Sequence, residues 1–376
     1  MIYLDYAATT PIHPDVKEIM QQYLTIDGDF GNSTSRHAFG KRALDAIEMA
    51  RQQVASALHA EADEIIWTSG ATEANNLAIK GIAALYKNKG KHIITMTTEH
   101  KAVLDPCMQL EKEGFQVTYL PPLANGLLSL AALEQACRDD TILVSVMAVN
   151  NETGVIQDLA GIREITTKRG ILLHTDAVQA IGKLQFDVSK IPFDAISLTA
   201  HKVYGPKGIG ALFLRKRPRI RVAPLIQGGG QEAGMRAGTL PTHQIVGMGK
   251  AYELAKLHFA NNHGHINLLR QTFLNDILSL PNTRLNVDGK HTVAHIANIQ
   301  FGNHIADALL EAVPHLAAST AAACQEKGGG GSHVLRAMGL SQDAVKASIR
   351  FSFGHFLTID DVKNATQQIK QLFSVT

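Results

Sequence analysis

The feature that most restricts the fold of this chain is an alternation, from about residue 60 onward, of short apolar runs with longer amphipathic segments. The runs are rich in Ile, Leu and Val, as are strands buried on both faces of a sheet, and the segments between them have helical periodicity. The runs are EIIWTSG, KHIITMT, FQVTYL, TILVSVMAV, GILLHTD, FDAISLTA and IGALFLR. Because strands that alternate with helices form parallel sheets, the sequence predicts an α/β domain with a largely parallel sheet at roughly residues 12–255.

A second, smaller unit is predicted for the C-terminal part of the chain. The segment GTLPTHQIVGMGKAYELAKLHFA has the pattern of a long helix with an early proline. After it, HIANIQF and ASIRFSF resemble strands, and IADALLEAV and TIDDVKNATQQIKQLF resemble amphipathic helices. We therefore expect residues 256–376 to form a smaller α+β domain, with residues 1–11 packed into it.

The composition excludes several classes of function. Among 376 residues, 45% are hydrophobic and 19% are charged, which is typical of a globular protein with a sizeable core. Lys and Arg total 36 against 34 Asp and Glu, and no block of like charge occurs, so any contact with nucleic acid is expected to be indirect. No apolar run approaches the length of a membrane span.

The cysteines and histidines indicate the compartment and argue against a resident metal. Cys107, Cys137 and Cys324 form no C-x-x-C pair and cannot all be in disulfides, and the N-terminal MIYLDYAATTPIHPD lacks the apolar core of a signal peptide. We therefore expect a cytoplasmic protein with free thiols. The 17 histidines form no H-E-x-x-H or Cys/His cluster with metal-ligand spacing, so no metal site is predicted.

Polar residues follow several predicted strands at their carboxyl ends, where open α/β sheets bind ligands. In TSGATEANN, free backbone N–H groups at a helix start and the Thr72 hydroxyl suit a phosphate. Asp176 ends a second strand, where a charge is costly unless it is paired. Lys202 follows a third strand, and a buried amine of lowered pKa serves as a Schiff-base nucleophile. His100 begins a helix after a fourth.

These four features match the needs of pyridoxal 5'-phosphate. This cofactor requires a lysine for its aldehyde, an acid for its pyridinium nitrogen and a cradle for its phosphate, and often a flat group against its ring. Each residue alone has a structural explanation, since a lysine at a strand end usually extends its amine to solvent and an aspartate there usually caps the backbone. Their joint occurrence favours a cofactor site.

A series of motifs makes the chain resemble the cysteine desulfurases of the class V aminotransferase family. These motifs are YLDYAATTP, TSGATEANNLAIKG, TEHKAVL, VNNETGVIQ, HTDAVQAIGK, HKVYGPKGIGAL, GGGQEAGMRAGT and SIRFSFG. Their order and spacing agree with the family over nearly the whole chain. The resemblance implies a pyridoxal-phosphate enzyme of fold type I, with a large α/β domain and a smaller α+β domain, that acts as a homodimer.

The resemblance also implies which residues contact the cofactor ring. Lys202 would hold the cofactor as a Schiff base, Asp176 would pair with the pyridinium nitrogen and His100 would stack on the ring. Gln179, near Asn151, would hydrogen-bond the ring oxygen.

The resemblance also implies which residues bind the cofactor phosphate and the substrate. Ala71, Thr72, Thr199 and His201 would cradle the phosphate, and Thr239 would reach the phosphate in the partner subunit. Arg350, with Asn151, would bind the substrate carboxylate, because a planar guanidinium fits that bidentate task. An ordinary ion pair would explain Arg350 equally well without the other motifs.

Cys324 precedes a run of glycines in AAACQEKGGGGSHV. A lone cysteine beside such a run is most simply part of a surface loop, but the resemblance places Cys324 where this family keeps its sulfur-accepting thiol. The implied reaction converts L-cysteine to L-alanine and leaves a persulfide on Cys324, and a glycine-rich tether suits a thiol that must pass sulfur on. Cys107 and Cys137 are expected to be structural.

The sequence does not identify the acceptor of the sulfur. The flank STAAACQEKGGGG lacks the Ser/Gly-rich surroundings usual in the family. An acceptor protein in iron–sulfur assembly, tRNA thiolation or DNA phosphorothioation is compatible with the sequence, as is a transient iron–sulfur contact at Cys324. Alternatives are a selenocysteine lyase, another class V enzyme such as an aminotransferase, and a non-catalytic regulator. An aminotransferase has no need of Cys324, and a regulator would be expected to have lost Lys202, Asp176 or Cys324.

Overall fold

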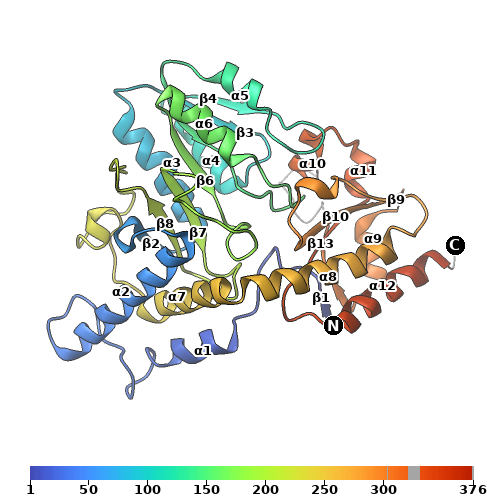
Figure 1. Cartoon of the computed structure of the whole chain (residues 1–376), viewed down its shortest axis with the longest axis horizontal. Helices are drawn as coiled ribbons and strands as arrows, with labels where there is room; N and C mark the ends of the chain where they lie inside the picture. Colours follow the sequence, from blue (N-terminus) through green and yellow to red (C-terminus); the bar gives the residue numbers. More distant parts are fainter. Residues whose placement is uncertain (303, 321–330, 375–376) are drawn as a thin grey trace.

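The computed structural model describes residues 1–302, 304–320 and 331–374. Its central sheet has seven strands, which coincide with the apolar runs of the sequence. They are β2 (Ile65–Thr68), β3 (His92–Met96), β4 (Gln116–Leu120), β5 (Thr141–Ser145), β6 (Leu172–Asp176), β7 (Ala195–Thr199) and β8 (Gly210–Leu214). They lie in the order β2-β8-β7-β6-β5-β3-β4 (Figure 1). Only β8 runs antiparallel to its neighbours in this sheet, so the predicted α/β fold is confirmed.

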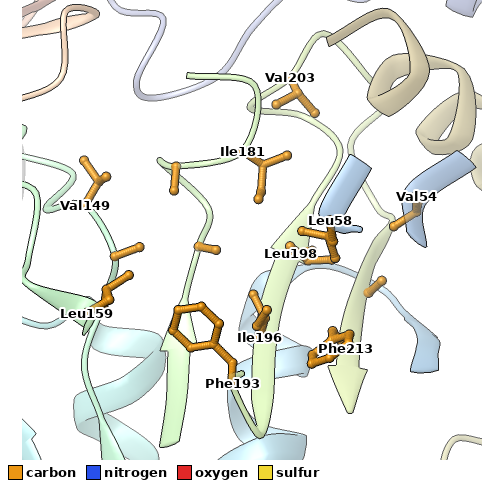
Figure 2. Packing of buried hydrophobic residues seen from close by; sticks show 14 of the residues in the cluster. Val54, Leu58, Val149, Leu159, Ile181, Phe193, Ile196, Leu198, Val203 and Phe213 are labelled. Carbon is orange, nitrogen blue, oxygen red and sulfur yellow. The ribbon is translucent and has the colours of Figure 1, made fainter. Parts of the chain in front are cut away.

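Helices cover both faces of this sheet because side chains alternate between the faces along each strand. Ile65 and Trp67 belong to one buried cluster, whereas Ile66 between them belongs to another. The first cluster includes residues of α2 (Ala38–Leu58), α5 (Leu130–Ala136), α6 (Leu159–Arg169) and α7 (Thr242–Leu257). The second includes residues of α3 (Ala71–Tyr86) and α4 (Lys101–Lys112). Figure 2 shows part of the first cluster, where Leu58 lies beside Leu198.

A second sheet of four strands lies beyond the C-terminal end of α7. Its strands are β12 (Ser319–Thr320), β13 (Ser348–Ser352), β10 (Ile296–Phe301) and β9 (Thr283–Leu285), in that order. The helices of this part are α8 (Phe259–Ile277), α9 (Ala306–Ala312), α10 (His333–Ala337), α11 (Gln342–Lys346) and α12 (Ile359–Ser374). Of these helices, α8, α9 and α12 share with the sheet a separate apolar cluster centred on aromatic residues such as Phe273 and Phe351. Residues of α10 and α11 form another small cluster with Val155 and Val287.

The long helix expected before this second sheet is broken. α7 ends at Leu257, and the chain resumes as α8 after His258, whose backbone is not helical (φ −99°, ψ 12°). Figure 1 shows α7 and α8 end to end, running from the large sheet toward the small one. The polar start of α8, FANNHGH, has no apolar periodicity, which is why the sequence did not predict this helix.

The N-terminal segment connects the two sheets. β1 (Ile2–Tyr3) pairs in parallel with β11 (Leu316–Ala317), and the N–H of Ser352 donates to the carbonyl of Leu4 at 2.7 Å. A few residues later the N–H of Thr10 donates to the carbonyl of His201, at the edge of the large sheet, at 3.0 Å. The short segment between them therefore spans the space between the two sheets.

No helix in the described ranges is both long and apolar enough to cross a membrane.

Substituting Leu4→Ala tests whether this segment is held mainly by apolar packing. The Leu4 side chain is fully buried, so we expect its truncation to lower the free energy of unfolding by about 2–5 kcal/mol, measured as a shift of the urea midpoint. The control is Ile12→Ala on the same segment, since Ile12 is 43% exposed and should cost less than about 0.5 kcal/mol. Equal shifts for the two variants would contradict this account.

Candidate active site

A cavity of about 760 Å³ lies beyond the carboxyl ends of β5, β6 and β7. It collects residues from distant parts of the chain because parallel strands end at the same edge of a sheet. Its lining includes most of the site residues that the sequence predicted: Ala71, Thr72, His100, Asn151, Asp176, Gln179, Thr199, His201, Lys202 and Arg350. Thr239 does not line the cavity and is exposed on the loop before α7. Cys324 lies outside the described residues.

The Lys202 amine is held by the N-terminal segment. Its Nζ donates to the main-chain carbonyls of Ala7 at 2.6 Å and Ala8 at 2.5 Å. Burial, followed by the positive charge of Arg350, lowers the pKa of Lys202 to about 8. A substantial fraction of the amine is therefore uncharged near neutral pH, as a nucleophile requires.

Asp176, at the end of β6, is a buried carboxylate without a cation beside it. Its Oδ2 accepts from Asn75 Nδ2 at 2.7 Å, and its Oδ1 accepts from the N–H of Val178 at 3.0 Å. Among the described residues no Lys, Arg or His lies within ion-pair distance of it, although the residue is only 7% exposed. A buried charge of this kind calls for a cationic partner, and a protonated ring nitrogen would be one.

The start of α3 supplies a place for an anion. Gly70 is the N-cap and contributes no side-chain cap, and the first N–H groups of a helix have no partner within the helix. The negative charge nearest this turn, that of Glu73, is paired with Arg236 at 2.9 Å. Thr72 and Thr199 add hydroxyl groups to the same wall. The arrangement can bind a phosphate.

Two histidines of the cavity are neutral near neutral pH because burial lowers their pKa. For His201 the pKa falls to about 4, and its Nδ1 lies 3.1 Å from the hydroxyl of Thr9. For His100 the pKa is lowered, and its Nδ1 accepts from the N–H of Ala102 at 3.1 Å as the cap of α4. That bond places the proton of His100 on Nε2 and fixes the direction of a flat, uncharged ring.

Gln179 is oriented by contacts that the sequence did not predict. Its Nε2 donates to the carbonyl of Ala7 at 2.9 Å, and its Oε1 lies 3.1 Å from His295 Nε2. Burial holds the pKa of His295 well below its ordinary value, so the ring is neutral and donates through Nε2 to Gln179. His295 immediately precedes β10, so a contact between the two sheets sets the direction of the amide.

Arg350, on β13, lines the cavity and also pairs with an acidic neighbour, Asp5. Its Nη1 donates to the carbonyl of Asn151 at 2.9 Å, and its Nη2 donates to Asp5 Oδ1 at 2.8 Å and to Ser319 Oγ at 2.9 Å. Its Nε is buried without a partner. The guanidinium therefore keeps unused capacity for a carboxylate, in competition with Asp5, which the sequence did not predict to belong to the site.

The described residues on either side of 321–330 are attached to the wall of the cavity. On one side Ser319 donates to Asp5 at 2.8 Å, and Thr320 pairs with Ile349 of β13. On the other, the Ser332 hydroxyl donates to Glu152, and His333 Nε2 donates to the carbonyl of Glu99 at 3.0 Å. The predicted thiol of Cys324 thus belongs to a segment whose two flanks lie at the active site.

Glu99, the residue before His100, is a fully buried group that the sequence did not single out. Its Oε1 accepts from the N–H of Met147 at 2.8 Å, and its Oε2 is buried without a partner. Burial, followed by the negative charge of Asp176, raises the pKa of Glu99 well above its ordinary value. Burial therefore favours the protonated form of the Glu99 carboxyl group.

The other two thiols are buried. Burial raises the pKa of Cys107 to about 12 and also raises the pKa of Cys137, so neither is a ready nucleophile. In the described ranges no group of three His, Cys, Asp or Glu side chains is placed to hold a metal ion.

Comparison with known proteins shows the family to which the chain belongs. The sequence model of the class V aminotransferases matches residues 2–365. The chain belongs to the class V aminotransferase family. It is 52% identical over 370 residues to a cysteine desulfurase IscS of Vibrio vulnificus (strain YJ016), covering 98% of this chain and 92% of that protein. The family predicted from the motifs is confirmed.

Solved structures give the same result for the fold. A NifS-like protein superposes with a TM-score of 0.93 at 34% identity over the full length of both chains. A structure described as SspA in complex with cysteine superposes with a TM-score of 0.85 at 39% identity, covering 95% of this chain and all of that one. The fold type I architecture predicted for the class V aminotransferase family is therefore present.

Pyridoxal 5'-phosphate, the predicted cofactor, is the cofactor of this family, and the cavity fits it. Asp176 offers a buried carboxyl group without a cationic partner among the described residues, the start of α3 offers N–H groups for a phosphate, and Lys202 offers an amine of lowered pKa. The roles of the individual residues stay predictions.

The raised pKa of Glu99 predicts a pH-dependent effect of Glu99→Gln. Since the pKa of Glu99 is higher in the folded than in the unfolded protein, the unfolded chain loses this proton first, and stability falls as pH rises above about 4.5. Gln keeps the acceptor for Met147 but does not titrate. We expect Glu99→Gln to raise the melting temperature more at pH 8 than at pH 5. Glu18→Gln, a change at an exposed residue, serves as the control. If the difference in melting temperature between Glu99→Gln and the wild type were the same at both pH values, Glu99 would be ionised in the folded protein.

Proposed function

We propose that this chain is a pyridoxal-phosphate-dependent cysteine desulfurase that converts L-cysteine to L-alanine and holds the sulfur as a persulfide on Cys324. The observation that carries the proposal is that Lys202, Asp176 and Arg350 line one cavity. An amine, a buried unpaired acid and a guanidinium are the groups that a pyridoxal enzyme acting on an amino acid needs. The extent of identity to a cysteine desulfurase over nearly the whole chain supports the same substrate.

The cofactor would be held from three sides. Asp176 would pair with its ring nitrogen, His100 would stack on its ring and Gln179 would donate to its ring oxygen. Its phosphate would lie among the residues of the anion-binding wall, which are Ala71, Thr72, Thr199 and His201. When bound, pyridoxal phosphate supplies an electron-accepting ring that stabilises negative charge on the substrate carbon.

Lys202 binds the cofactor through its amine and afterwards moves the proton of the substrate Cα. Its lowered pKa leaves part of the amine uncharged and able to accept that proton. The carbonyls of Ala7 and Ala8 accept hydrogen bonds from the same Nζ, so they fix the position of the free amine.

Arg350 binds the α-carboxylate of cysteine through its guanidinium, which lines the cavity, and Asn151 borders the same place. This fixes which end of the substrate faces Lys202.

Sulfur transfer belongs to Cys324. Its thiolate attacks the substrate sulfur, an S–S bond forms and the substrate C–S bond breaks. The electron pair of the broken bond stays on the substrate carbon, which takes up a proton and becomes the methyl group of alanine. The persulfide is then passed to an acceptor protein.

The partners of the reaction follow from the same proposal. The enzyme acts as a homodimer in which the exposed Thr239 reaches the phosphate site of the partner subunit. The buried free thiols of Cys107 and Cys137 suit a reducing compartment such as the cytoplasm. The acceptor serves iron–sulfur assembly, tRNA thiolation or DNA phosphorothioation, with nucleic acid involved only through that acceptor.

The proposal is tested by supplying L-cysteine and a thiol reductant and measuring alanine and sulfide together. The wild type should release them in equal amounts, and Cys324→Ala should retain the visible absorption of the bound cofactor but lose turnover. The control Cys137→Ala removes a buried thiol outside the cavity and should keep turnover. Normal sulfide release by Cys324→Ala would overturn the assignment of this thiol. Turnover of selenocysteine but not cysteine would favour a selenocysteine lyase.

The contact between Asp5 and Arg350 predicts an effect on substrate binding. Asp5→Asn removes a negative charge that competes with the substrate carboxylate but keeps an acceptor for Ser319. We expect the KM for cysteine to fall about 3- to 10-fold, with a smaller change in kcat, in steady-state kinetics. Asp15→Asn, an exposed change in α1 (Pro14–Gln21), is the control. An unchanged or higher KM with unaltered thermal stability would contradict competition by Asp5.

A further inference from the structure

A second cavity, of about 240 Å³, lies next to the active site, and we refer to it as the Lys183 cavity. Lys202 lines both cavities, so the two are neighbours. The walls of the Lys183 cavity come from the N-terminal segment, from the loops after β6, β7 and β13, and from the junction of α7 with α8. They are mainly apolar and aromatic, and include Val203, Tyr204, Leu254, Ile266, Phe353 and Phe356.

Lys183 places an amine in this cavity that pairs with no acidic side chain among the described lining residues. Its Nζ donates to the main-chain carbonyl of Lys202 at 2.8 Å, which is its one hydrogen bond among the described residues. An ammonium group has three N–H donors, so two remain unused. None of the described side chains that line the cavity is Asp or Glu.

The Lys183 side chain is half-buried and has no acidic side chain beside it among the described lining residues. Burial, together with the positive charge of Lys202, lowers the pKa of Lys183 to about 7. A charge removed from water is costly unless an opposite charge is beside it, and the described lining residues supply none here. An anion that entered the cavity would supply the missing charge.

The shape of the cavity limits the size of that anion. Its volume is below the about 300–1,000 Å³ of pockets that hold drug-sized molecules, so a single ring fits and a nucleotide does not. Phe353 is fully buried in its wall, whereas His258 and Phe356 are exposed. The cavity therefore has a buried apolar part and a route to solvent.

A second polar group of the cavity is also without a partner. The Nδ1 of His355 is buried and makes no hydrogen bond, although its main-chain N–H donates to the Tyr204 hydroxyl at 2.9 Å. The His355 ring lies 3.7 Å, centroid to centroid, from the ring of Tyr204. The cavity thus combines stacked rings with polar atoms that lack partners, a common composition for a small-molecule site.

We propose that the Lys183 cavity is a binding site for a small aromatic carboxylate. The carboxylate of the ligand pairs with the Lys183 amine, and its ring packs against the rings of Tyr204, Phe353 and Phe356. This site is separate from the proposed reaction and does not depend on it.

The test titrates the cofactor-loaded enzyme with 3-fluorophenylacetate and follows binding by fluorine NMR. The neutral 3-fluorophenylacetamide has the same ring and should bind about tenfold more weakly. Lys183→Met removes the amine and keeps the chain length, and should weaken binding of the acid by about tenfold as well. The control Lys190→Met changes a lysine whose side chain is 76% exposed and should leave binding unchanged. Absence of binding, or equal binding of acid and amide, would overturn the proposal.

Two further variants identify the cavity in which the acid binds. Arg350→Gln should leave the affinity for 3-fluorophenylacetate unchanged, since loss of binding in this variant would place the acid in the active site. Ala255→Leu extends a side chain of the Lys183 cavity wall and should weaken binding of the acid by about tenfold, even if Lys183→Met fails to fold. Full binding by Ala255→Leu would show that the ligand lies elsewhere.

Discussion

The hydrogen bonds from the Lys202 amine to the carbonyls of Ala7 and Ala8 are the contact on which the active site depends. They join the large sheet to a segment whose preceding residues pair with the small sheet. The same segment reaches Gln179 through Ala7, His201 through Thr9 and Arg350 through Asp5. One short stretch of backbone thus sets the distance between the groups that would hold the cofactor and the group that would hold the substrate.

Burial decides the charges in the site. It lowers the pKa values of His100, His201 and His295 and raises that of Glu99, which favours the uncharged form of each group. Asp176 has no cationic partner among the described residues, and Arg350 keeps an N–H group without a partner among them. These two groups can therefore form their strongest electrostatic interactions with the cofactor and the substrate. Such interactions are stronger in a low-dielectric site than in water.

The sequence predicted the elements well where one local signal was enough. The apolar runs identified every strand of the large sheet, and polar residues at their ends identified Asp176, Lys202 and His100. The break at His258 was missed because the start of α8 has no apolar periodicity. Asp5, Glu99 and His295 were missed for another reason. Each is unremarkable in its own segment, and its importance comes from a partner far away in the chain, namely Arg350, Met147 and Gln179.

The sequence by itself therefore determined the fold class, the family and the types of group that the site contains, since apolar periodicity and motif spacing are properties of the linear chain. Only the tertiary structure decided which groups are charged and which contacts orient them, because burial and long-range hydrogen bonds exist only once the two sheets are packed together. Lys183 illustrates the difference. In the sequence it is an ordinary lysine after a glycine. In the folded protein it is a half-buried lysine at a cavity whose described lining holds no acid, because the N-terminal segment, α7, α8 and the loops after β6, β7 and β13 meet there.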